Sequence, residues 1–159
     1  MKKARRAARE LALNILYQCD SAGVPFDEAL ETSLEFADLS GLDAKGRNAS
    51  EEVRGYARSL AEGAREHKKS LDEAINRLAE GWPLERQPAV DRNILRIAIY
   101  EIEHVESVPP VVAVDEAVEL AKRFSTADSG KFVNGVLAGY LREKKTSEQE
   151  ECASGSEDS

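Results

Sequence analysis

Apolar side chains recur along this chain at intervals of three and four residues, and this spacing is the strongest constraint on its fold. The first such run consists of Ala8, Leu11, Ala12, Ile15, Leu16 and Cys19. On an α-helix these positions share one face, so the run predicts a helix over about residues 4–20. The apolar face must be buried against other elements, and similar spacing elsewhere indicates that these elements are also helices.

Helix-starting residues mark the segments that follow. Pro25 suits the first turn of a second helix, and Ser50 suits the N-cap of a third. After a bend, Ser70 to Glu73 read as a capping box that would begin a fourth helix. The segment Gly81-Trp82-Pro83 then predicts a stop, because glycine and proline both interrupt a helix.

The second half of the chain continues in the same way. Pro88 opens a helix that is apolar over much of its circumference, which is typical of the central helix of a bundle. Pro109-Pro110 breaks the chain before the next amphipathic helix, and Asp128 would cap the last one. We therefore predict an all-α fold, a compact bundle of six or seven helices without a convincing strand.

Composition excludes several classes of protein. No apolar run approaches the 18 residues of a membrane-spanning helix, and no apolar signal-peptide core follows the basic start. Cys19 and Cys152 are isolated from each other in the sequence, which predicts reduced thiols and a cytoplasmic protein.

No catalytic constellation is visible in the sequence. His67 and His104 each lack a second histidine or a cysteine at metal-ligand spacing, and no glycine pattern resembles a phosphate-binding loop. We expect no metal, no cofactor and no enzymatic activity.

Charge is distributed unevenly along the chain, although its total of −8 by itself argues against a nucleic-acid ligand. Residues 146–159 carry five acidic and no basic side chains. The first nine residues carry five basic and no acidic side chains. We call these five cations the basic head: Lys2, Lys3, Arg5, Arg6 and Arg9. Three of them form one stripe on the predicted helix, so the basic head predicts contacts with several phosphates. A solubilising amino terminus and attraction to acidic residues of the body remain as alternatives.

Four segments of the sequence, taken together, resemble one known family. They are residues 5–13 (RRAARELAL) with Leu16-Tyr17, residues 82–86 (WPLER) with 90–101 (VDRNILRIAIYE), residues 114–124 (VDEAVELAKRF) and residues 128–137 (DSGKFVNGVL). Each segment alone is little more than an amphipathic helix. In this order and spacing they resemble the NusB transcription antitermination family over residues 5–137.

The resemblance implies an all-helical RNA-binding factor built from two small subdomains. Members of the family bind the boxA element in the leader RNA of ribosomal RNA operons, together with NusE, a ribosomal protein of the small subunit. The complex joins a transcribing RNA polymerase and suppresses premature termination. This implies boxA RNA, NusE and the elongation complex as partners, without a membrane, and leaves monomer and homodimer both open.

The resemblance also assigns roles to individual residues. The set that matches RNA-binding positions consists of Arg5, Arg6, Arg9, Asp128, Lys131 and Phe132. The set that matches the NusE-facing side consists of Tyr17, Glu85 and Asp91. Residues 10–145 hold 17 basic and 25 acidic side chains, a balance that suits a basic protein partner. The chain departs from the family at Ala7, where some members carry arginine.

Three of these residues have plainer alternatives. Phe132 could offer a face on which a base stacks, or it could be buried beside Val133. Asp128 could accept a hydrogen bond from a base edge or a sugar hydroxyl as well as cap its helix. Tyr17 could anchor a partner or be partly buried near the apolar face of its helix.

The predicted domain organisation is a NusB-like RNA-binding domain over residues 1–145 and a disordered acidic tail over residues 146–159. The tail is not part of the family pattern. Two other classes of binding protein stay open: an RNA-targeting module of the kind fused to RNA methyltransferases, and a purely structural protein-interaction module.

Overall fold

The computed structural model describes residues 2–42 and 49–156. Within these ranges the chain forms seven α-helices and two short 3₁₀ helices, and it forms no strand. The α-helices are α1 (Lys2–Ala22), α2 (Phe26–Phe36), α3 (Ala49–Glu66), α4 (Lys68–Leu78), α5 (Ala89–His104), α6 (Pro110–Phe124) and α7 (Ala127–Ser156). The 3₁₀ helices are η1 (Ser40–Leu42) and η3 (Leu84–Arg86). The prediction of an all-α fold is confirmed.

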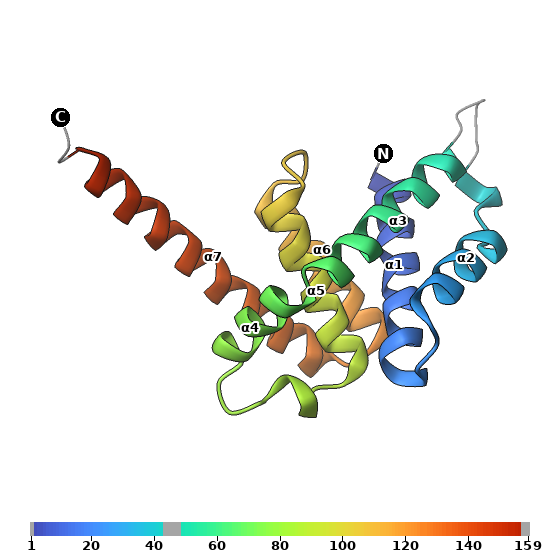
Figure 1. The fold of residues 1–159 in the computed structure, drawn as a ribbon, viewed down its shortest axis with the longest axis horizontal. Coiled ribbons are helices and arrows are strands. Elements are labelled where there is room, and N and C mark those ends of the chain that lie inside the picture. Colours follow the sequence, from blue (N-terminus) through green and yellow to red (C-terminus); the bar gives the residue numbers. More distant parts are fainter. Residues whose placement is uncertain (1, 43–48, 157–159) are drawn as a thin grey trace.

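Helix α5 lies at the centre of the bundle, where it packs against α1, α3, α4, α6 and α7 (Figure 1). Every residue from Asn93 to Ile99 is buried, so the helix is covered on all sides, as its apolar circumference predicts. Helices α1, α2 and α3 pack on one another, and α4 to α7 form a second group. The two groups correspond to the two expected subdomains, and α5 joins them.

Three helix starts differ from the prediction. Helix α3 begins at Ala49, so Ser50 lies within the helix and not at its N-cap. Helix α4 begins at Lys68, so Ser70 lies inside its first turn, and the Ser70 hydroxyl donates to the carbonyl of His67 at 3.0 Å. Helix α7 begins at Ala127, and its cap is Thr126, whose hydroxyl accepts the backbone N–H of Ser129 at 3.0 Å. Asp128 therefore lies in the first turn, because Thr126 occupies the capping position two residues earlier.

One close approach between helices was not predicted. A Cβ atom at Gly63 of α3 would lie 2.1 Å from the ring of Tyr100 of α5, which real side-chain contacts do not allow. Glycine at this position therefore lets the aromatic ring pack directly on the backbone of α3.

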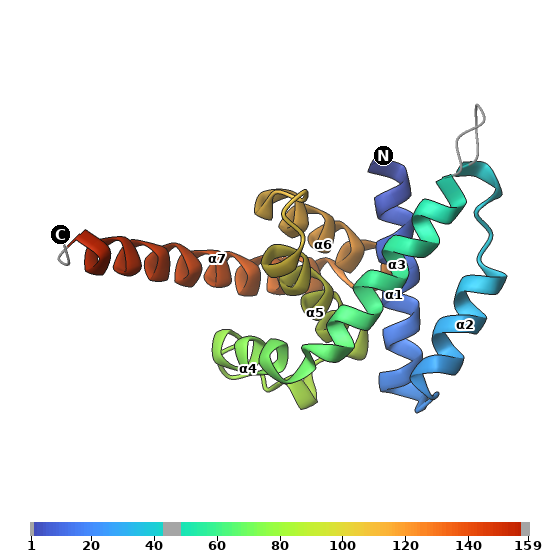
Figure 2. The ribbon, with the colours of Figure 1, turned by 45° about the horizontal axis from the view of Figure 1, so that its top comes forward.

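Helix α7 continues well beyond the predicted end of the folded domain. It runs through Ser156 and projects away from the bundle (Figures 1 and 2). Glu143 pairs with Arg77 at 2.7 Å and Lys144 with Glu103 at 3.4 Å, whereas residues 145–152 are all exposed. The expected tail is thus helical over 146–156, in keeping with the helix propensity of its Glu, Gln and Ala residues. Residues 157–159 lie outside the described part, and a domain boundary at residue 145 stays a prediction.

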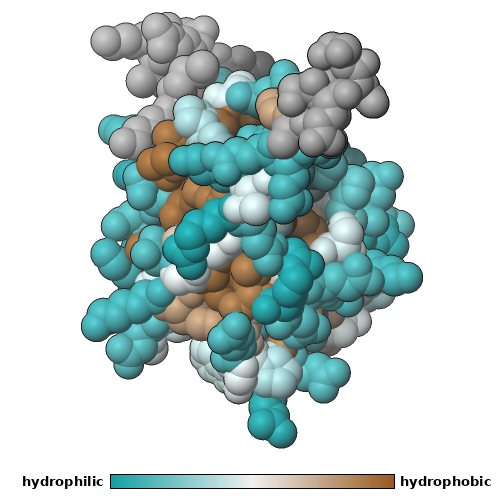
Figure 3. All heavy atoms as spheres, turned by 90° about the vertical axis from the view of Figure 1, so that its left-hand side faces the viewer, coloured by the Kyte–Doolittle hydropathy of each residue, from teal (hydrophilic) through white to brown (hydrophobic). Residues whose placement is uncertain are grey.

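The surface is mostly hydrophilic, with apolar residues gathered in the middle of one face (Figure 3). The large apolar side chains that are exposed are Tyr17, Phe36, Val111, Val112 and Phe124. Within the described ranges, none of the helices has both the length and the apolar character that crossing a membrane requires.

Candidate nucleic-acid and protein interfaces

The basic head occupies the first turns of α1, and its side chains differ in how far they are available. Lys3 is exposed. The guanidinium of Arg5 lies over the ring of Tyr56 at 4.6 Å and donates to the hydroxyl of Ser107 at 3.1 Å. Arg6 donates through Nε to both carboxylate oxygens of Glu116, at 2.8 and 3.0 Å, while its side chain stays 46% exposed. Lys3, Arg5 and Arg6 thus remain near the surface.

Arg9 lies in the interior, which the predicted RNA-binding stripe does not anticipate. Its guanidinium donates to the two carboxylate oxygens of Glu101 at 2.7 and 2.9 Å, and the side chain is 4% exposed. The Tyr56 hydroxyl donates to the same carboxylate. Burial alone would lower the pKa of Arg9, but the hydrogen bonds and charge of Glu101 raise it above its ordinary value. Arg9 therefore holds α1 against α5 and does not offer its charge to phosphate in this structure.

The start of α7 presents the second group of predicted RNA-binding residues. Asp128 and Lys131 are exposed, and no described residue forms an ion pair with Lys131. Phe132 is half-buried and meets the ring of Trp82 edge-on, with 4.5 Å between ring centroids. Phe132 is thus partly buried against Trp82, and the accessible part of its ring could still stack on a base.

Helix α6 lies between the basic head and the start of α7. Glu116 of α6 pairs with Arg6, and Arg123 near the end of α6 pairs with Glu10. A groove of about 640 Å³ is lined by Arg6, Val112, Asp115, Glu116, Val118, Glu119, Lys122 and Asn134. Arg6 of the basic head and Asn134 of α7 thus line one groove, whereas Asp128, Lys131 and Phe132 are not among its lining residues.

The end of α6 adds candidates that the sequence analysis did not assign. Lys122 and Arg123 are exposed cations between the two predicted segments, and the Arg123 guanidinium lies 5.1 Å from the centroid of the exposed Phe124 ring. An exposed aromatic ring beside two cations is typical of surfaces that bind single-stranded RNA. The signal in the sequence was the run Lys122-Arg123-Phe124 at the end of an amphipathic helix.

The three residues predicted to face NusE are not equally accessible. Tyr17 is 40% exposed and Glu85 is exposed on η3. Asp91 is fully buried in the first turn of α5, beneath the start of α7, and accepts a hydrogen bond from the Ser129 hydroxyl at 2.8 Å. The structure thus removes Asp91 from the surface: its Oδ2 accepts from the buried Ser129 hydroxyl, and its Oδ1 has no hydrogen-bond partner among the described residues.

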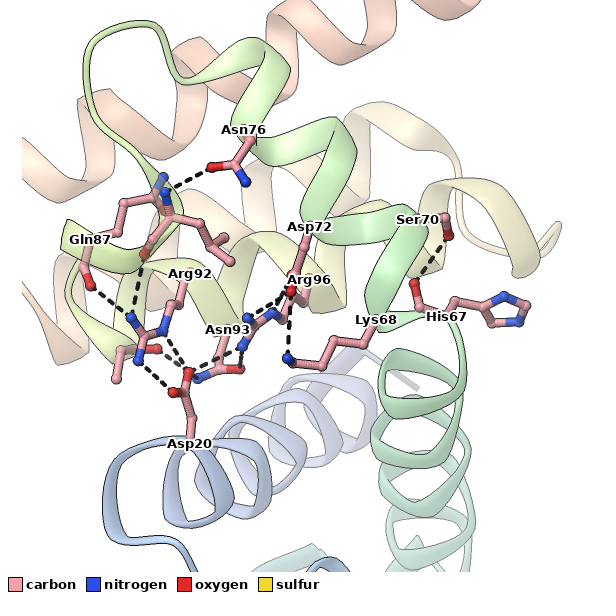
Figure 4. Close-up of polar contacts among 12 residues, drawn as sticks. Asp20, His67, Lys68, Ser70, Asp72, Asn76, Gln87, Arg92, Asn93 and Arg96 are labelled. Carbon is pink, nitrogen blue, oxygen red and sulfur yellow. Dashed lines mark hydrogen bonds and ion pairs between the residues drawn. The ribbon is translucent and has the colours of Figure 1, made fainter.

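An ion cluster joins the carboxyl end of α1 to α4 and α5 (Figure 4). Asp20 accepts from Arg92 at 2.6 Å, from Asn93 at 3.0 Å and from Arg96 at 3.1 Å. Arg96 also donates to both oxygens of Asp72, at 2.7 and 3.2 Å. Burial alone would raise the pKa of Asp20, but the hydrogen bonds from Arg92 and Asn93 lower it below its ordinary value. The cluster fixes the end of α1 near the exposed Tyr17.

The remaining titratable groups include two histidines that lie together. His67 and His104, which are isolated in the sequence, stack with 4.4 Å between ring centroids, and Tyr100 lies beside both rings. Among the described residues no group of three or more His, Cys, Asp or Glu side chains could hold a metal ion. Cys19 and Cys152 are both free thiols, and burial raises the pKa of Cys19.

Comparison with known proteins identifies the family. The NusB family profile matches residues 6–142. A transcription antitermination protein NusB from Symbiobacterium thermophilum is 49% identical over 142 residues, which cover 89% of this chain and 92% of that protein. This chain belongs to the NusB family. A second NusB, from Salinispora arenicola, is 44% identical over 90% of this chain and 98% of its own length.

Solved structures of the NusB family share this fold. NusB of T. maritima superposes with a TM-score of 0.70 at 37% identity, covering 87% of this chain and 91% of that one. A NusB chain from a crystal structure of the antitermination factors NusB and NusE in complex with double-stranded RNA has a TM-score of 0.72 at 29% identity, covering 90% and 99%.

Proposed function

We propose that this chain is a transcription antitermination factor that binds boxA RNA together with NusE in the complex of a transcribing RNA polymerase. The observation that carries this proposal is membership of the NusB family across residues 6–142. The similar NusB chain solved with NusE and RNA supports both partners. In this role the protein acts in the cytoplasm as a binding factor rather than as an enzyme.

The proposed RNA surface combines the basic head with the start of α7. On α1 it uses Lys3, Arg5 and Arg6, with Lys2 at the very start of the helix. At the start of α7 it uses Asp128, Lys131 and Phe132. Binding of a phosphate by Arg6 would compete with Glu116, which now holds its guanidinium. Arg9 contributes indirectly, because it holds α1 in place.

The proposed protein surface uses Tyr17 and Glu85. An exposed aromatic side chain can anchor an interface, and an exposed carboxylate on an acidic body favours association with a basic ribosomal protein. Asp91 lies beneath the start of α7, where it bonds to Ser129, and is not part of this protein surface.

Replacing Arg5, Arg6 and Lys131 together with alanine tests the RNA surface. We expect weaker binding to boxA RNA and a shallower dependence of log affinity on log salt, by about 0.7 for each phosphate that the variant no longer neutralises. Fluorescence anisotropy with a labelled boxA oligonucleotide at several salt concentrations measures both quantities.

A matched control is Arg77→Ala, since Arg77 is also an exposed arginine paired with a glutamate, but on α4. It should keep the wild-type affinity and slope. An unchanged slope in the triple variant, or an equally weakened control, would rule out this surface.

A further inference from the structure

The first turn of α7 contains a buried hydroxyl group, that of Ser129, with three hydrogen-bond partners. The Ser129 hydroxyl lies 2.8 Å from the Asp91 carboxylate, 2.8 Å from the Ser125 hydroxyl and 3.1 Å from the Thr126 hydroxyl. An ionised carboxylate only accepts, so Ser129 donates its single proton to Asp91 and accepts from the other two hydroxyls. One donated and two accepted bonds exhaust the capacity of a hydroxyl group, and they fix Ser129 in one orientation.

The carboxyl group of Asp91 makes one side-chain hydrogen bond with the described residues. It is completely buried, it forms no ion pair with a described residue, and its Oδ1 atom has no hydrogen-bond partner there. Burying a carboxylate with a single donor is costly, although the first turn of α5 offers some compensation through the helix dipole. The hydrogen bond to Ser129 is the specific contact that this buried charge makes.

Ser129 lies within the first turn of α7, between the exposed residues of the proposed RNA surface. Asp128 precedes it, and Lys131 and Phe132 follow it by two and three residues. Successive helix residues point about 100° apart, so fixing Ser129 toward α5 also fixes the directions of these neighbours. The edge contact between Phe132 and Trp82 is consistent with the same rotation of the helix.

We propose that Asp91 and Ser129 are positioning residues for RNA binding: the buried hydrogen bond between them sets the rotation of the first turn of α7. This inference rests on the proposed RNA surface. Neither residue touches RNA, and both act through Asp128, Lys131 and Phe132.

A double-mutant cycle tests the proposal. Ser129→Ala should weaken binding to labelled boxA RNA about tenfold in the otherwise wild-type protein, but by no more than about twofold in the Asp128→Ala/Lys131→Ala background. A residue that acts by positioning these side chains keeps only the smaller effect that it exerts through Phe132 once Asp128 and Lys131 are gone. A residue that only stabilises the fold would weaken binding equally in both backgrounds.

A conservative variant and a remote variant distinguish loss of this hydrogen bond from general destabilisation of the fold. Asp91→Asn keeps an oxygen that can accept from Ser129, so it should bind RNA within about twofold of wild type, whereas Asp91→Ala should resemble Ser129→Ala. Ser70→Ala removes a hydroxyl that bonds only within α4 and should leave RNA affinity unchanged. Circular dichroism at the assay temperature verifies that each variant is folded.

The outcomes distinguish this inference from the proposed function. The proposal is overturned if Ser129→Ala binds normally while Asp128→Ala/Lys131→Ala weakens binding, or if Ser129→Ala costs the same in both backgrounds. If Asp128→Ala/Lys131→Ala itself binds like wild type, the failure lies with the α7 part of the proposed RNA surface.

Discussion

Arg6 and Arg9 lie on the same helix but differ in their surroundings, so their removal should have different consequences. Arg9→Ala leaves Glu101 buried without its cation, which should cost about 3–5 kcal/mol of unfolding free energy. Arg6→Ala removes a half-exposed partner of the buried Glu116, which keeps Arg9 at 4.0 Å, so it should destabilise the fold less than Arg9→Ala does. Urea denaturation followed by circular dichroism measures both changes.

Removal of Arg6 and removal of Arg9 should also differ in their effect on RNA binding. Arg6→Ala should weaken binding to boxA RNA while the protein stays folded. A stable Arg9→Ala protein whose only defect is weaker RNA binding with a shallower salt slope would mean that Arg9 contacts phosphate directly.

The sequence predicts residue types better than residue environments. It identifies the cations of the basic head and the acidic side chains of the body, but it does not reveal which of them pair. Arg9 meets Glu101, 92 positions away, and Asp91 meets Ser129, 38 positions away. Such long-range partners depend on the packing of helices, so a periodic pattern cannot distinguish an exposed charge from a buried, paired one.

Among the helices, α5 contacts the segments that carry both proposed surfaces. Its first turns hold the start of α7 through Asp91 and the end of α1 through Arg92, Asn93 and Arg96. Because these residues lie on consecutive turns of one rigid helix, the segments that carry Tyr17 and Lys131 are fixed relative to the same scaffold.

The contact between α1 and α5 should depend on pH through Asp20. Its pKa is lowered in the folded protein, so the ionised carboxylate stabilises the fold at pH values above the ordinary aspartate pKa of about 4. This contribution disappears as the pH falls through the lower pKa of the folded state. The stability difference between wild type and Asp20→Asn should therefore be largest near neutral pH and shrink in acid. Urea denaturation from pH 7 to pH 3 measures it, and a constant difference would show that the charge of Asp20 contributes nothing.

Helix positions were predictable from the sequence, whereas their exact starts were not. Apolar periodicity together with Pro25, Pro88 and Pro109 correctly separates the main helices, because these signals are local. The capping residue of α7 is Thr126 rather than Asp128, since several suitable side chains lie within three positions. The helix in residues 146–156 was also missed, because the absence of apolar residues argues against burial but not against helix formation.

At the scale of the whole molecule, the distribution of charged side chains explains how a protein with a net negative charge can bind RNA. The excess of acidic side chains lies in residues 10–145 and 146–159, whereas the exposed cations of the proposed RNA surface gather on the start of α1, the end of α6 and the start of α7. The proposed NusE-facing residues Tyr17 and Glu85 lie on α1 and η3. Separate surfaces would allow both partners to bind at once.

Binding of boxA RNA in the presence and absence of NusE tests this central claim most directly. Fluorescence anisotropy at one fixed salt concentration should show tighter binding to boxA RNA than to a scrambled RNA of the same length, and still tighter binding when NusE is added. Equal affinity for the two RNAs, unchanged by NusE, would contradict the proposed function.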